Sequence, residues 1–155
     1  MRRSTIRLVV DTNTLLRGLA KRECPSGQII TAIEERQVLL RTSKRVVEEY
    51  RLILLDPLLL ARFPTLTPRS VEGALRGLTY LSHDLGRLRT RFEFLRDRKD
   101  EKFLALAIAG RATHLLTFDQ DLLSLENSHN EAAKRLRQRV PGLRIQEPSD
   151  FVHEH

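Results

Sequence analysis

Short apolar runs that alternate with longer helical segments constrain the fold of this chain more than any other feature. The runs IRLVV (6–10), VLL (38–40), HLLT (114–117) and LRI (143–145) are too short for helices and predict buried strands. LGRLRTRFEFL (85–95) alternates between apolar and charged residues, which predicts a further strand with one charged side. Strands that alternate with helices are typical of a parallel sheet. We therefore expect an α/β fold, a three-layer α/β/α sandwich with a central, mostly parallel sheet of about five strands.

The segments between these runs carry helix signals at their ends. Ser43 is placed to cap one helix, and the Thr67–Pro68 pair opens the next. A polar break, ENSHN, interrupts the helical pattern late in the chain. The expected helices cover residues 12–20, 28–36, 43–57, 67–83, 100–111, 121–139 and 148–155.

The chain has 155 residues, enough for one hydrophobic core, and we expect a single domain over 1–155. Its longest apolar stretch, LILLDPLLLA, is interrupted by Asp56 and Pro57 and is too short to cross a bilayer. The apolar run before Asp11 is too short for a signal peptide. These observations predict a cytoplasmic protein with no membrane association. Cys24 is the only cysteine, which excludes an internal disulfide.

The charge balance favours a polyanionic partner. The formal net charge is +7, and 22 of the 27 basic residues are arginine. Because the planar guanidinium grips a phosphate with two hydrogen bonds, an arginine-rich surface suits RNA. GC-rich coding, which raises arginine at the expense of lysine, explains the same composition equally well.

Acidic residues follow the predicted strands at one edge of the sheet. Asp11 comes directly after strand 6–10, and Asp119 lies two residues after strand 114–117. Asp100 opens the helix that follows the third predicted strand, so the start of that helix reaches the same edge. In parallel sheets, ligands bind at the carboxyl ends of the strands. An acid at the end of a buried strand has few structural roles, and Asp11 is therefore the strongest candidate for function.

Helical phase selects among the other acids. In SKRVVEEYRLILL the apolar residues form one face, and at 3.6 residues per turn Glu49 borders this face whereas Glu48 points into solvent. In DEKFLALAIAG, Asp100 falls in line with the apolar stripe, Glu101 lies at its margin and Lys102 lies outside it. Glu49 and Asp100 are therefore the acids expected to lean toward the sheet.

Carboxylates that converge in one cleft repel each other, and a divalent cation relieves this repulsion. Carboxylate and water ligands suit Mg²⁺ or Mn²⁺, and the five histidines show no zinc-like spacing. Such a site activates water and stabilises the leaving oxygen of a phosphodiester. Structural roles stay open for the acids taken singly. Asp97 and Asp100 also suit an N-cap and a first-turn acid, and Asp121 suits a helix cap.

Four stretches of this sequence together resemble the PIN-domain family, named for the PilT N-terminus, which includes the toxin nucleases of VapC-type toxin–antitoxin pairs. The stretches are VVDTNTLLRGLA, TSKRVVEEYRLIL, DRKDEKFLALAIAGRATHLLTFDQDLLSL and PGLRIQEPSDFV, and they span nearly the whole chain. The third, with its acid–helix–strand–Thr–x–Asp pattern, is the most specific.

The resemblance implies site residues and an activity. It assigns metal-binding, catalytic acids to Asp11, Glu49, Asp100 and Asp119. Supporting roles are implied for Thr117, which steadies the site, for Asn13 in the signature, for Asp121 as an additional metal-binding acid, and for Asp97 as an upstream acid. The implied activity is endonucleolytic RNA cleavage with Mg²⁺ or Mn²⁺ that leaves a 5′-phosphate. Toxin members of the family are usually dimers that an antitoxin holds inactive.

The sequence departs from the family pattern in two places. Phe118 stands where the family often has glycine. The phenylalanine side chain either narrows the cleft or packs beneath it. The segment ENSHNEAAKRLRQRV (126–140) is longer and more basic than the usual connection. This segment is best interpreted as a solvated amphipathic helix. An RNA contact and a dimer surface are the less favoured interpretations.

Three further interpretations stay open. Arg87, Arg89 and Arg91 share one side of the predicted strand and either contact RNA phosphates or pair with Glu93 and solvent. The opening VVDTNT also resembles haloacid dehalogenase-like phosphohydrolases, but Asn13 stands where that chemistry requires a second acid. A catalytically silent binding domain is the third interpretation, against which the retention of all four acids argues.

Overall fold

A five-stranded, fully parallel sheet forms the centre of the computed structural model, which describes residues 5–155. The strand order is β3-β2-β1-β4-β5. The predicted α/β class and central sheet are therefore confirmed. The strands are β1 (Arg7–Val10), β2 (Leu39–Thr42), β3 (His83–Asp84), β4 (His114–Leu116) and β5 (Arg144–Gln146).

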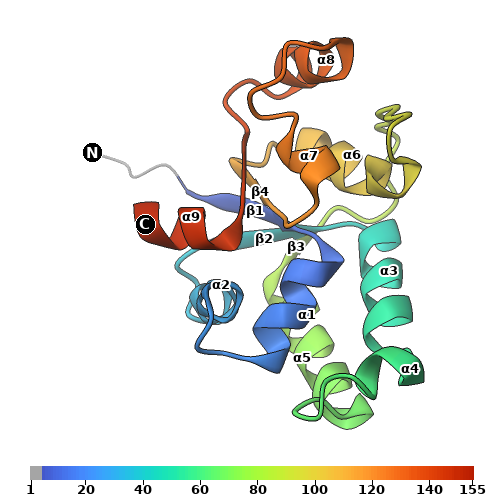
Figure 1. The fold of residues 1–155 in the computed structure, drawn as a ribbon, viewed down its shortest axis with the longest axis vertical. Coiled ribbons are helices and arrows are strands. Elements are labelled where there is room, and N and C mark those ends of the chain that lie inside the picture. Colours follow the sequence, from blue (N-terminus) through green and yellow to red (C-terminus); the bar gives the residue numbers. More distant parts are fainter. Residues whose placement is uncertain (1–4) are drawn as a thin grey trace.

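Helices cover both sides of this sheet. Figure 1 shows the sheet nearly edge-on, with α1, α2, α3 and α5 on one side and α6, α7 and α8 on the other, which is the expected three-layer arrangement. The helices are α1 (Thr12–Ala20), α2 (Pro25–Glu34), α3 (Lys44–Leu54), α4 (Pro57–Leu60), α5 (Pro68–Leu81), α6 (Glu101–Ala109), α7 (Gln120–Leu123), α8 (Glu131–Arg139) and α9 (Pro148–Glu154), with a 3-10 turn η1 (Arg98–Asp100) before α6. None of the helices within residues 5–155 combines the length and apolar composition that a bilayer crossing needs.

The central strands are apolar on both faces because helices cover both. Leu8, Val9, Leu115 and Leu116 are completely buried, as expected for strands inside a parallel sheet. Leu104 of α6 is also completely buried within the same core. This rigid centre holds the ends of β1 and β4 in register, with Val10 opposite Leu116.

Side-chain caps set several helix starts where the sequence indicates them. The Ser43 hydroxyl accepts from the backbone N–H of Val46 at 3.3 Å and begins α3, as predicted. Thr67 and Ser70 form a reciprocal capping box at the start of α5. The expected helix over 43–57 breaks at Leu55–Asp56, and the expected helix over 121–139 is two short helices, α7 and α8.

The predicted strand over 85–95 is wrong. The strand at this edge is only His83–Asp84, and no regular structure follows until η1. The reason lies in the neighbouring strand: β2 ends at Thr42, and Ser43 caps a helix, so a partner strand has nothing to pair with beyond Gly86. The alternation in the sequence reports burial instead, since Phe92 and Phe94 are buried whereas Arg91 and Glu93 are exposed.

Candidate metal-dependent active site

Three carboxylates meet at the carboxyl edge of the sheet. One oxygen each from Asp97, Asp100 and Asp119 lies within 4.8 Å of the other two. Asp119 follows β4 and caps α7, where its Oδ1 accepts from the Asp121 N–H at 2.8 Å. Asp97 caps η1, where its Oδ1 accepts from the Lys99 N–H at 3.0 Å. The caps that start two short helices thus bring these acids together.

Asp11 lies beneath this cluster at the end of β1. It is buried, and its Oδ1 accepts from the Thr14 N–H at 2.9 Å. The Thr117 hydroxyl donates to Asp11 Oδ2 and accepts from the Asp119 N–H, the latter at 2.9 Å. Thr117, which is completely buried, therefore links the acid after β1 to the acid after β4. Burial raises the pKa of Asp11, while the hydrogen bonds from Thr117 and Thr14 act to lower it.

Asp100 is the least satisfied acid of the group. Its side chain is buried, and among the described residues its Oδ2 has no hydrogen-bond partner. Burial, then a side-chain hydrogen bond with Asp119, then the charges of Asp119, Asp97 and Asp11 raise the pKa of Asp100 to about 8. An unpartnered buried carboxylate oxygen beside two other carboxylates is the environment that a hard divalent cation stabilises. The donor set therefore fits Mg²⁺ or Mn²⁺.

Glu49 leans toward this edge but is already paired. The Thr12 hydroxyl donates to Glu49 Oε2, and the Lys102 ammonium lies 2.5 Å from Glu49 Oε1. Glu48, its neighbour in α3, is exposed, which agrees with the helical phase expected for this pair. Lys102, which the sequence places outside the apolar stripe, still reaches Glu49, because its long stem carries the ammonium there.

The remaining predicted residues lie around the cluster. Asp121 pairs with Arg96 at 2.7 Å and does not cap α7, since Asp119 does. Asn13 is exposed in the first turn of α1. Phe118 is half-buried with the Arg17 guanidinium 4.3 Å from its ring centre, so it packs under a cation at the side of the cluster.

Sequence reasoning undervalued one residue and missed the contacts of two. Asp97 received only a supporting role, yet it lies within the three-acid cluster. The sequence signal for Asp97 is the spacing in DRKD, because a single 3-10 turn over these residues brings the carboxylates of Asp97 and Asp100 close together. Lys102 has no sequence signal for its contact with Glu49, because the contact depends on the separation between α3 and α6. Thr12, in the DTNT signature, likewise has no sequence signal for its contact with Glu49.

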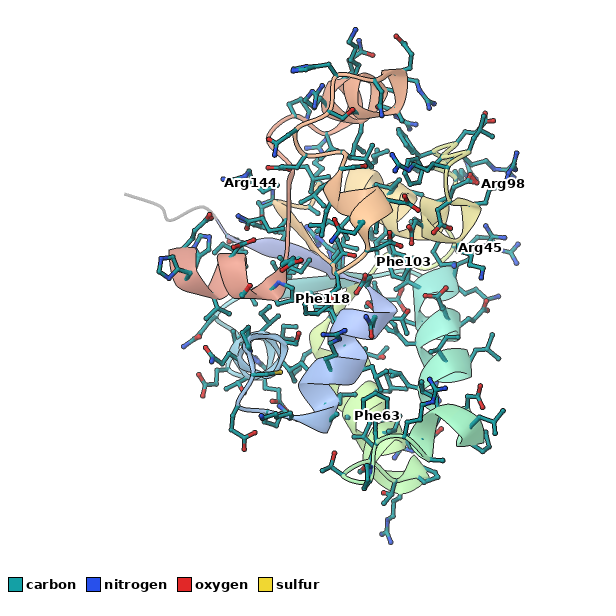
Figure 2. All side chains as sticks on the ribbon, viewed as in Figure 1. Arg45, Phe63, Arg98, Phe103, Phe118 and Arg144 are labelled. Atoms are coloured by element: carbon teal, nitrogen blue, oxygen red, sulfur yellow. The ribbon has the colours of Figure 1, made fainter. Side chains whose placement is uncertain are left out.

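A cavity of about 760 Å³ opens beside the acids. Arg87 and Arg91 line this cavity, whereas Arg89, which sequence alternation places with them, is not among its lining residues. Figure 2 shows Arg45, at the start of α3, and Arg98, in η1, on the same flank of the molecule. The residues that line the cavity are Ser43, Lys44, Arg45, Glu48, Gly86, Arg87, Leu88, Thr90, Arg91, Phe92, Glu93, Glu101, Lys102 and Ala105.

A parallel sheet with clustered acids at its carboxyl edge defines a class of α/β domain suited to metal-dependent phosphate chemistry. Comparison with protein-family models identifies a PIN domain over residues 7–121, and the chain belongs to the PIN domain family. PIN nucleases act on nucleic acids and typically use divalent metals. The chain is also 27% identical over 154 residues to an uncharacterized protein of Methanocaldococcus jannaschii, with 99% of this chain and 94% of the relative covered.

Proposed function

We propose that this protein is a Mg²⁺- or Mn²⁺-dependent endoribonuclease. The observation that carries the proposal is the cluster of Asp97, Asp100 and Asp119, whose oxygens lie within 4.8 Å of one another. The buried Oδ2 of Asp100 has no hydrogen-bond partner within residues 5–155, and a cation at this place stabilises it. Both features support a metal centre.

The acids take distinct roles in this proposal. Asp97, Asp100 and Asp119 hold the cation, and Asp11 stands behind them, fixed by the hydroxyl of Thr117. Glu49 is the fifth acid of the proposed site and is held in place by Thr12 and Lys102. The proposed supporting residues at the edge of the cluster are Asp121 and Asn13.

The bound cation supplies Lewis acidity and positive charge at the scissile phosphodiester. The residues of this chain hold the carboxylates in position. Burial of Asp11 and Asp100 holds two carboxylates rigidly, and Thr117 fixes the distance between the ends of β1 and β4. Glu49, at the border between buried and exposed, is placed to accept a hydrogen bond from an attacking water. Hydrolysis of the P–O3′ bond then leaves a 5′-phosphate and a free 3′-hydroxyl.

The basic charge of the chain suits a nucleic acid substrate, and the resemblance to VapC-type toxins favours RNA over DNA. The same resemblance supports a role as the toxin of a type II toxin–antitoxin pair, acting in the cytoplasm as a homodimer that a cognate antitoxin inhibits. Co-expression with the product of an adjacent small gene tests this finer role. A stable complex with loss of cleavage supports it, and independent behaviour of the two proteins contradicts it.

Cleavage of total cellular RNA and of a labelled RNA oligonucleotide, with Mg²⁺, with Mn²⁺ and with chelator, tests the activity itself. We expect cleavage that requires the metal and yields 5′-phosphate ends. Asp119→Asn abolishes it, and Glu48→Gln, which changes the same charge on an exposed side chain, retains it. Absence of cleavage with both metals contradicts the proposal. Turnover of a simple phosphomonoester in place of RNA favours the phosphohydrolase interpretation.

A further inference from the structure

Lys102 joins two parts of the proposed metal-dependent site. Its ammonium, from the first turn of α6, donates to Glu49 Oε1 at 2.5 Å and to the backbone carbonyl of Lys99 at 2.8 Å. Lys99 lies in η1, the turn that Asp97 caps and that ends at Asp100. One ammonium therefore fixes Glu49 of α3 beside the turn that carries two of the three clustered acids.

The ion pair between Lys102 and Glu49 is sheltered from solvent. The side chains of both residues are only 21% exposed. Salt screens a partly buried pair much less than an exposed one, so the ammonium is a lasting positive charge at this place. A lysine ammonium is a compact point charge with three donors, and Glu49 and Lys99 already engage two of them. The chain itself therefore balances the charge of Glu49.

Two acids of the site, Glu49 and Asp11, already have a donor on each oxygen. Glu49 Oε1 accepts from Lys102, and Glu49 Oε2 accepts from the Thr12 hydroxyl. Asp11 Oδ1 accepts from a backbone N–H of α1, and Asp11 Oδ2 accepts from the Thr117 hydroxyl. The chain's own donors therefore satisfy both carboxylates without a cation.

The three clustered acids differ from these two. Within residues 5–155, Asp97, Asp100 and Asp119 form the only group of three acidic, histidine or cysteine side chains whose ligand atoms lie within 4.8 Å of one another. In the same part of the chain, Oδ2 of Asp100 has no hydrogen-bond partner. The geometry therefore offers one place where three carboxylates meet and call for a divalent cation.

We propose, on the basis of the proposed function, that this centre binds one divalent cation and that the Lys102 ammonium takes the place of a second. In two-metal phosphodiesterase sites the ions lie about 3.5–4 Å apart and share the charge of the acids between them. Here the ammonium already provides positive charge beside Glu49 and repels a divalent cation that approaches this carboxylate. Lys102 is thus a positioning residue that holds Glu49 and sets the number of ions.

The test counts Mn²⁺ ions bound to the protein alone, by titration calorimetry and by electron paramagnetic resonance, which also detects the coupling between two neighbouring Mn²⁺ ions. We expect one ion per chain in the wild type and two coupled ions in Lys102→Met, which keeps the stem and removes the charge. Addition of Glu49→Gln to Lys102→Met should return the count to one. The matched control is Lys99→Met, which removes an exposed lysine charge from η1 and should keep one ion.

Two ions in the wild type overturn the proposal, and so does a single ion in folded Lys102→Met. A second ion in Lys99→Met as well as in Lys102→Met also overturns it, because a general loss of positive charge then explains the gain. Circular dichroism reports whether the variants fold. Lys102→Gln keeps a hydrogen-bond donor for Glu49 without the charge, and it replaces Lys102→Met in the same comparison if the methionine variant does not fold.

The ion count is made without RNA, which separates this inference from the proposed function. One ion in the wild type and two in Lys102→Met, without cleavage of any RNA, contradict the nuclease and support the role of Lys102. Metal-dependent cleavage by a wild-type protein that binds two ions contradicts the role of Lys102 alone. No bound Mn²⁺ at millimolar concentration overturns both.

Discussion

The acid cluster and the cavity lie side by side but are built differently. Asp11 and Asp119 follow paired strands, are tied by the buried Thr117 and accept backbone hydrogen bonds. Arg87 and Arg91 are exposed on a segment that has no sheet partner. The core therefore fixes the positions of the acids, whereas the arginines beside them lie on a segment that no neighbouring strand holds.

The largest effects are expected from the loss of a catalytic acid, and Asp100→Asn tests one at the centre of the cluster. The amide removes one anionic ligand at the centre of the cluster, and we expect cleavage to fall by more than about a hundredfold, since even outer partners of metal sites are worth 10–100-fold. Initial rates at saturating RNA and Mg²⁺ measure this loss. The fold is retained, because the uncharged amide does not add to the repulsion among the neighbouring acids. Activity within a few-fold of wild type contradicts the role of Asp100.

Thr117→Val tests the link between the two strand ends. The valine keeps the volume of the side chain but loses a hydrogen bond to Asp11 and another from the Asp119 N–H. Leaving buried polar groups without partners costs about 1–3 kcal/mol each. Denaturant unfolding should show the lower free energy of unfolding, and a cleavage assay should show the reduced activity. A Thr113→Val variant, on the half-buried side chain just before β4, serves as a control for general loss of a hydroxyl beside the sheet.

The stability of the metal-free protein should depend on pH in a defined direction. The pKa of Asp100 is raised to about 8 from its ordinary value of 3.8, so between these values the folded state holds a proton that the unfolded state has lost. Stability is therefore greatest below about pH 4 for this group and decreases as the pH rises toward about 8. The raised pKa of Asp11 acts in the same direction.

Thermal unfolding with chelator, from about pH 5 to about pH 8, measures this dependence. Asp100→Asn should flatten it, and Mg²⁺ at the upper end should restore stability because the cation binds the folded state. An equally steep decrease in Asp100→Asn contradicts the assignment of the effect to this carboxyl.

The smallest effect is expected from Glu48→Gln, on the exposed side of α3. Glu48→Gln should leave kcat unchanged, whereas Glu49→Gln, one residue along, removes the carboxylate that pairs with Lys102 and should abolish cleavage. The two variants carry the same change of charge, so a difference between their cleavage rates reports the position of the side chain on α3 and not the lost charge. Equal losses in both contradict the side of α3 assigned to the site.

The carboxyl edge of the sheet follows from the sequence, and the cavity does not. Local signals suffice for β1, β4 and the Ser43 cap, since apolar runs and caps are determined by neighbouring residues. The segment 85–95 shows the limit: alternation reports which side chains are buried and does not report whether a partner strand exists. The ion pair between Lys102 and Glu49 joins two helices far apart in the chain, and only packing brings them together.

X-ray diffraction from crystals soaked in Mn²⁺ tests whether the clustered acids bind a divalent cation, because the anomalous signal of manganese locates the ion. The account predicts a peak bonded to carboxylate oxygens of Asp97, Asp100 and Asp119, and its disappearance in Asp100→Asn. No peak among these acids at millimolar Mn²⁺, or a peak held elsewhere in the molecule, contradicts it.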